Sequence, residues 1–321
     1  MFIVVGSPSA NAITGEVIVG AGAEPLFCQQ VSDILTEVIN SFEDGNLTPQ
    51  HTMFTKEGFR TTTQLLKQTG MKNARRTHRT NLVNLDRGGW EVRDIKVKVK
   101  LGETANNEVQ AATDPTEYLV FDLTPKGLID NVNFSVARGH VKKLIDDGKR
   151  LGDSARRLKI LQTVEIFRTA YCRKDLDYLN RIFSDDALII VGRVLKPRED
   201  IPDMLQSSGL GKERIQFVRR TKAEYLAGLE VVFKRNAFVK VVFDSLDVLQ
   251  HGDDPDLYGV SLKQNWYSST YSDTGWVFLL WDFKDDHNPT IYVRSWQPEK
   301  FEDDSIIGLY DFKIERGKAQ D

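Results

Sequence analysis

Residues 167–194, with the sequence FRTAYCRKDLDYLNRIFSDDALIIVGRV, constrain the fold more than any other stretch. Apolar side chains recur there at helical spacing, first in one helix and then in a shorter second helix. The residues that form these apolar faces are Phe167, Ala170 and Tyr171, followed by Leu176, Tyr178, Leu179 and Phe183. A β-rich run at 188–191 follows the SDDA segment. This order predicts two helices that lead into a strand.

The rest of the second half continues with one helix and a set of strands. Thr221 and Glu224 have the spacing of a capping box, which predicts a helix over 221–235. Strands are predicted from alternating or continuous apolar runs, and SDTG at 272–275 is interpreted as a hairpin turn. The predicted strands span 237–243, 258–270, 276–283 and 290–297.

The first half shows the same order, with helices before strands. Helical spacing covers 27–42 and 56–68. The segment WEVRDIKVKVKL alternates, with Ile95, Val97, Val99 and Leu101 on one face, which indicates a half-buried strand. The segment EYLVFDLTPKGLIDNVNFSVA predicts two strands joined by a TPKG turn.

Both halves therefore predict an α+β fold in which helices pack on one face of a curved antiparallel sheet, in two tandem domains. The expected division is residues 13–137 for the first domain, 138–160 for a connecting segment, 161–300 for the second domain and 301–321 for a C-terminal tail.

The second half resembles the NTF2-like superfamily of α+β cones, which includes ketosteroid isomerase and the SnoaL-type cyclases. The resemblance rests on AYCRKDLDYLNRIFSDDALIIVG, the helix at 221–235, and the closing strands with WVFLLWDF and IYVRSW. It covers about 155–300. The closing strands also look like those of uncharacterised secreted bacterial proteins. The terminal hairpin of the first half suggests that this half is a diverged copy of the same fold.

Composition narrows the class of protein. The chain has 321 residues, 40% hydrophobic and 28% charged, which is typical of a globular protein. A net charge of −3 and a sequence pI near 6.0 provide no overall attraction to nucleic acid. Because no run of 18 or more apolar residues exists, no membrane span is predicted.

The first residues favour export. Residues 1–12 are interpreted as the remnant of a signal peptide, because Ala10-Asn11-Ala12 has the pattern that signal peptidase accepts. This predicts a periplasmic or extracellular protein. The alternative is an ordinary first strand with a Ser/Pro turn, in a cytoplasmic protein.

The resemblance implies a test for catalysis. In the isomerases of this superfamily, the carboxylate base lies on the strand after the SDDA-like segment, and the matching position here is Val191. A valine cannot accept a proton, so no catalytic residue is assigned. Asp185 and Asp186 are expected to cap a turn or face solvent.

A binding pocket is the remaining candidate site. The open end of such a cone would be lined by aromatic residues and one cation, which suit a flat or anionic ligand. The predicted pocket residues are Tyr171, Tyr178, Trp266, Tyr267, Arg294 and Trp296. Alternation along the last strand places Arg294 between Tyr292 and Trp296 on one face, where it is either a ligand clamp or stacks on the two rings at the surface. The alternative is that these aromatic residues simply form the core.

No cofactor or metal site is predicted. The segment VIVGAGAEP imitates a dinucleotide-binding turn, but Pro25 occupies the position of the third glycine, and no second parallel strand is predicted after the helix. The acidic loops at 251–256 and 285–287 lack the spacing of a calcium or zinc site.

Three functions stay open from the sequence. The first is a non-enzymatic exported protein that binds a small molecule in the pocket, or a partner or second copy on the sheet face through Trp276 and Trp281. The second is an isomerase or hydrolase that uses a different base, such as Asp185 or Asp282. The third is a structural module of a cell-envelope assembly.

Overall fold

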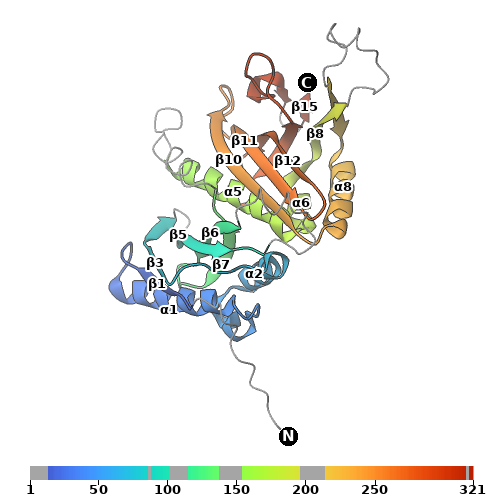
Figure 1. Cartoon of the computed structure of the whole chain (residues 1–321). Helices are drawn as coiled ribbons and strands as arrows, with labels where there is room; N and C mark the ends of the chain where they lie inside the picture. Colours follow the sequence, from blue (N-terminus) through green and yellow to red (C-terminus); the bar gives the residue numbers. More distant parts are fainter. Residues whose placement is uncertain are drawn as a thin grey trace. The chain divides into compact units, whose positions relative to one another are not determined.

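The computed structural model describes residues 14–85, 88–100, 115–136, 154–195, 214–315 and 318–320. The chain divides into two compact units, one formed by residues 1–135 with 237–239 and the other by 136–236 with 240–321. Each unit contains helices and a sheet of largely antiparallel strands, and the sheet of the second unit is visibly curved (Figure 1). The predicted α+β class is therefore confirmed.

The part of the first unit that the structure describes contains the helices α1 (Pro25–Ser41) and α2 (Lys56–Thr69), with a 3-10 turn, η1 (Thr48–Met53), between them. Its larger sheet has the order β2-β5-β6-β7, and β4 also pairs with β5. These strands are β2 (Lys72–Asn73), β4 (Leu82–Leu85), β5 (Gly89–Lys98), β6 (Thr116–Leu123) and β7 (Ile129–Phe134). A separate pair is formed by β1 (Glu16–Val19) and β3 (Thr77–Thr80), which run parallel. The expectation that no parallel strand follows the first helix was therefore wrong.

The alternating strand of the first unit is largely as predicted. Ile95, Val97 and Val99 are buried, and Leu101 lies outside the described residues. The alternation is interrupted at Asp94, which has a φ of 72°, beside a register shift between Val92 and Ile95. One extra residue there is a β-bulge, which restores the apolar face toward the core.

The described residues of the second unit form three helices and a six-stranded sheet. The helices are α5 (Ser154–Arg173), α6 (Leu176–Ile182) and α8 (Lys222–Arg235). The sheet has the order β10-β11-β12-β13-β8-β9, in which the β13–β8 pair is parallel and the β11–β12, β12–β13 and β8–β9 pairs are antiparallel. Its strands are β8 (Phe183–Leu195), β9 (Arg214–Arg220), β10 (Val239–Gln250), β11 (Leu257–Ser268), β12 (Ser272–Asp282) and β13 (Thr290–Gln297).

Local sequence explains where these helices begin. The Thr221 hydroxyl accepts from the Glu224 N–H at 3.2 Å, and the Glu224 carboxylate accepts from the Thr221 N–H at 2.9 Å. The predicted capping box is therefore confirmed. Asp175 caps α6 in a similar way, by accepting from the Tyr178 N–H.

One predicted turn was wrong. Residues 272–275 do not form the hairpin turn, because they already belong to β12 and pair with β11, with Asp273 opposite Trp266. The chain turns earlier, where the Ser268 N–H donates to the Tyr271 carbonyl at 2.8 Å. Asn236 fixes this turn, since its side-chain oxygen accepts from both Ser269 and Thr270.

The proposed contact through exposed tryptophans was also wrong for Trp281. Trp281 is 0% exposed and packs edge-on against Phe167, with ring centres 6.0 Å apart. Trp276 is half-buried, and the Lys300 ammonium lies 4.9 Å from the centre of its ring. Trp281 is therefore core and cannot present a partner surface.

The predicted domain boundaries stay predictions. Residues 1–12 and most of 138–160 lie outside the described residues. Within the predicted tail, the structure has η3 (Leu309–Asp311) and the short pair β14 (Lys313–Glu315) and β15 (Lys318–Gln320). Phe312 stacks on Phe278 at 5.8 Å, so this segment covers part of the sheet of the second unit. Whether the first half copies the second also stays a prediction.

Candidate ligand cavity

A cavity of about 670 Å³ lies in the second unit, between α8 and the strands β8, β9, β11, β12 and β13. Its volume falls in the range of small-molecule sites. Its walls combine aromatic rings with charged groups, among them Tyr225, Trp266, Asp273, Arg294 and Trp296.

The aromatic wall is held by a pair of tyrosines. The Tyr171 hydroxyl of α5 lies 2.7 Å from the Tyr225 hydroxyl of α8, and the Tyr171 ring packs edge-on against Trp266 at 5.9 Å. Tyr171 is only 2% exposed and lies behind the cavity wall. Burial is the main cause that raises the pKa of Tyr171 well above its ordinary value, and the nearby Tyr225 is the second cause. This hydroxyl therefore stays neutral.

Arg294 is the buried cation of the site. It is 6% exposed, its guanidinium carbon lies 5.1 Å from the centre of the Tyr225 ring, and it pairs with Ile189 of β8 and Leu279 of β12 along the sheet. Its Nε atom is buried and has no hydrogen-bond partner. Since a buried charge is costly without complete hydrogen bonding, the site is incomplete at this atom.

Asp273 is the functional candidate that the sequence did not reveal. It lies on β12, lines the cavity, and its Oδ1 atom is buried without a hydrogen-bond partner. Burial raises the pKa of this carboxyl group, and the Tyr271 hydroxyl and the Arg294 charge act in the opposite direction. The sequence hid this residue because SDTG looked like an exposed turn.

Trp296 adds a third polar atom to the same wall. Its indole Nε1 is buried and has no hydrogen-bond partner. The ring fits there because residue 275 is a glycine: a Cβ atom at Gly275 would lie 2.7 Å from Cε2 of Trp296 and 2.6 Å from the Gln297 carbonyl oxygen. Gly275 thus makes room for the indole.

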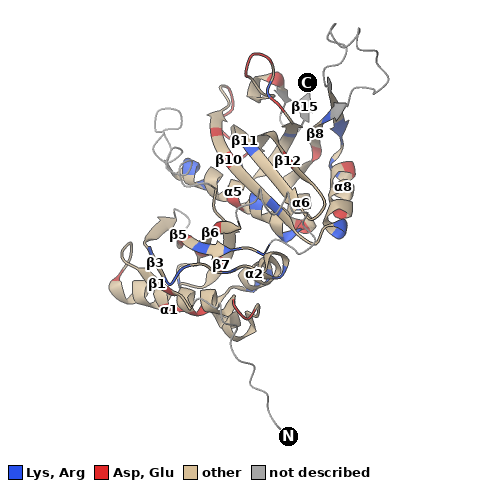
Figure 2. Ribbon diagram, in the orientation of Figure 1, with Lys and Arg blue, Asp and Glu red and all other residues tan. Residues whose placement is uncertain are grey.

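The cavity is lined by more cations than anions. Arg193, Arg220 and Arg235 join Arg294, whereas Asp273 is the one carboxylate among the described lining residues. Figure 2 shows basic positions on the strands beside α8 and at the C-terminal end of that helix. A positive cavity in a chain of net negative charge favours an anion locally.

Val191 lines the cavity, at the position where the resemblance expects a base. The other carboxylates considered from the sequence are not among the lining residues. The Asp185 side chain is 97% exposed and pairs with Lys222 at 2.7 Å, and Asp186 is exposed. Asp282 accepts from the Tyr292 hydroxyl at 3.0 Å and from the Lys284 N–H at 2.7 Å.

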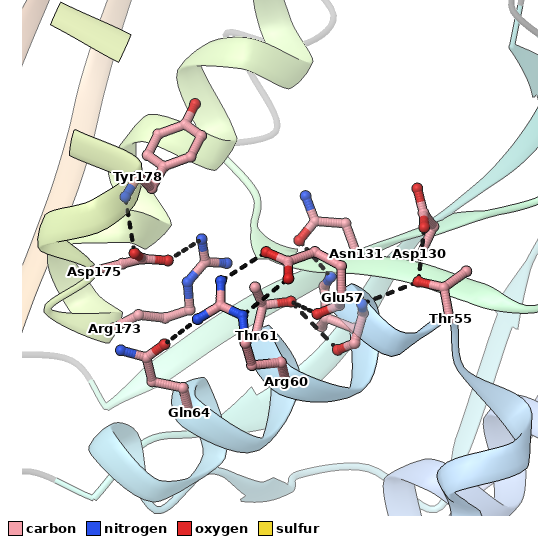
Figure 3. A network of polar contacts seen from close by, with 12 residues as sticks. Thr55, Glu57, Arg60, Thr61, Gln64, Asp130, Asn131, Arg173, Asp175 and Tyr178 are labelled. Atoms are coloured by element: carbon pink, nitrogen blue, oxygen red, sulfur yellow. Dashed lines mark hydrogen bonds and ion pairs between the residues drawn. The ribbon is translucent and has the colours of Figure 1, made fainter. Parts of the chain in front are cut away.

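The six residues predicted for the pocket are only partly brought together. Trp266, Arg294 and Trp296 line the cavity, and Tyr171 lies directly behind it. Tyr267 is half-buried and is not a lining residue. Tyr178 belongs to the α6 cap, where its backbone N–H donates to Asp175 Oδ1 at 3.0 Å (Figure 3). Burial raises the pKa of the Tyr178 phenol.

The prediction that Arg294 shares one strand face with two aromatic residues was partly wrong. Tyr292 does not join Arg294 on the cavity wall, but packs against the core cluster that contains Ile190 and Val293. The register of β13 against β8 shifts between Ile291 and Val293, which breaks the simple alternation of faces.

The described residues contain no group of three or more His, Cys, Asp or Glu side chains that could hold a metal ion. Among the same residues, no helix has both the length and the apolar character that crossing a membrane requires.

Comparison with known proteins gives a distant likeness. No family model matches the chain, and no curated protein matches it. Among solved structures, Bd1075 of Bdellovibrio bacteriovorus is 16% identical, with a TM-score of 0.33, over 53% of this chain and 47% of that one. The chain thus spans about half the length of that protein.

Two NTF2-like structures match at a similar level. A putative dehydratase from Streptomyces avermitilis is 11% identical, with a TM-score of 0.32, over 44% of this chain and 94% of that one. An NTF2-like protein from Cytophaga hutchinsonii is 17% identical, with a TM-score of 0.29, over 44% and 98%. These TM-scores are low, so the α+β architecture is established by the strand order and the helices of the chain itself.

Proposed function

We propose that this protein binds a small, planar, anionic molecule in the cavity of its second unit. The observation that carries the proposal is the buried guanidinium of Arg294, whose Nε has no partner, in a cavity that Trp266 and Trp296 also line. Aromatic faces favour a flat ligand body, and a guanidinium favours an anionic group. The arginines at 193, 220 and 235 would attract the same charge.

Binding, without the isomerase chemistry of the resembled superfamily, is the proposed role. The cavity position expected to hold the base is Val191, and a valine side chain transfers no proton. Export is proposed on the basis of the Ala10-Asn11-Ala12 pattern alone. Sequencing the N-terminus of protein recovered outside the cytoplasm would test it, and intact protein confined to the cytoplasm would contradict it.

A catalytic role is the second candidate, and Asp273 favours it. This carboxyl group lines the cavity, and burial raises its pKa, which is the usual preparation of a general acid or base. Keto-enol isomerase activity that disappears in Asp273→Asn would establish it in place of simple binding.

The binding proposal is tested with 2-naphthoate as the probe, by calorimetric titration near pH 6. Wild-type protein should bind the probe, Arg294→Met should lose at least about tenfold in affinity, and Arg219→Met should bind like wild type. Arg219 is the matched control, because it is exposed, lies on β9 beside Arg220 and is not among the lining residues. Equal affinity in all three proteins would remove Arg294 from the site.

A further inference from the structure

Three buried polar side-chain atoms without a hydrogen-bond partner line the same cavity. They are Nε of Arg294, Nε1 of Trp296 and Oδ1 of Asp273. Buried polar atoms are nearly always paired in folded proteins, so several orphans on one wall indicate groups that a ligand completes. Two of the three atoms donate a hydrogen bond, and the third accepts one when Asp273 is ionised.

The two donors define one side of the missing group. Arg294 and Trp296 are two residues apart on β13 and both line the cavity. A carboxylate offers two acceptor oxygens, which suits an N–H of a guanidinium and an N–H of an indole. It would also provide the buried guanidinium with an anionic partner.

The protonation state of Asp273 determines whether a ligand carboxylate can bind beside it. Two carboxylates at one site repel each other, so they share a proton rather than both staying ionised. A protonated Asp273 becomes a hydrogen-bond donor, and the ligand carboxylate then satisfies all three orphan atoms as an acceptor.

We propose that the cavity takes up an aromatic carboxylate together with one proton, and that the Asp273 carboxyl group holds this proton. The inference rests on the proposed binding function and adds the class of ligand and the coupling to pH. No covalent bond forms or breaks, and the proton comes from solvent.

Asp273 is the carboxyl group that lines the cavity, and the ionisable groups that face it are arginines and tyrosines. Arg294 on β13 and the arginines of β8, β9 and α8 are the cations that line the cavity. Tyr271 stays neutral, because its pKa is raised to about 12, first by burial and second by the charge of Asp273. Tyr171 and Tyr225 are the remaining phenols behind or on the wall.

The direction of the pH effect follows from linkage. Burial already raises the pKa of the free Asp273 carboxyl above its ordinary value, and a bound carboxylate raises it further. Affinity should therefore be greatest below the free pKa and decline as the pH rises toward the bound pKa, by at most about tenfold per pH unit for one proton.

The experiment measures binding of 2-naphthoate and of uncharged 2-naphthamide near pH 5 and near pH 8, by calorimetry. Wild-type protein should bind 2-naphthoate more tightly at the lower pH by at least about tenfold and bind 2-naphthamide equally at both. Asp273→Asn, which keeps the size of the side chain and an N–H donor, should bind 2-naphthoate equally at both pH values. Titration of wild type in two buffers of different ionisation enthalpy should yield uptake of about one proton.

The outcomes separate this inference from the proposed function. Binding of 2-naphthoate with no dependence on pH and no proton uptake in wild type would overturn the inference and leave the binding function standing. Preference for 2-naphthamide at both pH values would overturn the carboxylate class. Absence of binding by either probe at either pH would overturn both proposals. The proton-uptake measurement needs no variant, so it holds even where Asp273→Asn fails to fold.

Discussion

The guanidinium carbon of Arg294 lies 5.1 Å from the centre of the Tyr225 ring, and this contact joins β13 to α8 at the wall of the cavity. A buried arginine over an aromatic face gains a cation–π attraction, but it still pays for its lost hydration. Its Nε has no partner, so one hydrogen bond of the buried guanidinium is missing in the free protein. The second unit is thus locally destabilised at a position where a ligand would provide the missing hydrogen bond.

Stability should respond differently to two replacements of Arg294. A side chain that is 6% exposed leaves a cavity when it is truncated. We expect Arg294→Ala to lower the free energy of unfolding by about 1–3 kcal/mol. Arg294→Met, which fills most of the volume without a buried charge, should change it by less than about 1 kcal/mol. Urea unfolding of both variants checks this, and equal losses would contradict it.

Asp273→Asn should stabilise the protein near neutral pH. Because burial raises the pKa of the folded carboxyl group, the stability that Asp273 contributes is complete below its unfolded pKa and is lost as the pH rises through the folded pKa. The amide cannot ionise and escapes this loss. Thermal melting of wild type and variant should differ near pH 7 and converge near pH 4, and a constant difference at both pH values would count against the assignment.

Glycine at 275 should be required for the position of the indole. In Gly275→Ala the new Cβ meets the Gln297 backbone oxygen at 2.6 Å and the Trp296 ring at 2.7 Å, and the backbone atom cannot simply turn away. We expect a loss of about 1–3 kcal/mol in unfolding free energy. Gly252→Ala is the control, because no atom lies within 4 Å of its added Cβ. The two variants are compared by urea unfolding, and similar values would refute the clash.

Some elements could be predicted because short-range chemistry determines them. The capping box at Thr221 and the apolar face of Ile95 and Val97 are local patterns, and the structure has both. The α+β class followed from the order of such elements. Bulges and strand register depend on the partner strand, so the interruption at Asp94 could not be foreseen from the alternation around it.

The cavity shows the limit more clearly. Asp273 looked like a turn residue, since Ser, Asp, Thr and Gly are common in turns, yet Asn236 holds the turn a few residues earlier. Trp281 and Trp266 are both aromatic residues on predicted strands, but one is core and the other lines the cavity. That distinction depends on which face of the sheet each residue occupies, and this is set by pairing between strands.

The first unit offers an independent pH test at His78. This side chain is 1% exposed. Its pKa is lowered from an ordinary 6.5 to about 4, mainly by burial and secondly by the positive charge of Arg75. The Lys96 N–H donates to Nδ1 at 3.3 Å, so Nε2 carries the proton and donates to Asn73 Oδ1 at 2.9 Å. The Lys96 contact requires an Nδ1 without a proton, so the two contacts together fit the neutral ring with its proton on Nε2.

Acid should therefore destabilise the first unit through His78. The unfolded chain binds this proton near pH 6.5 and the folded one only near pH 4, so stability is complete above 6.5 and falls as the pH drops toward 4. The slope is at most about 1.4 kcal/mol per pH unit for a single group. NMR titration should find His78 neutral near pH 5.5, and urea unfolding should find less stability at pH 5 than at pH 7. The decline should persist in the exposed control His287→Gln. A His78 ring that titrates near pH 6.5 would show that the folded state accepts the proton, and the predicted loss would have no origin.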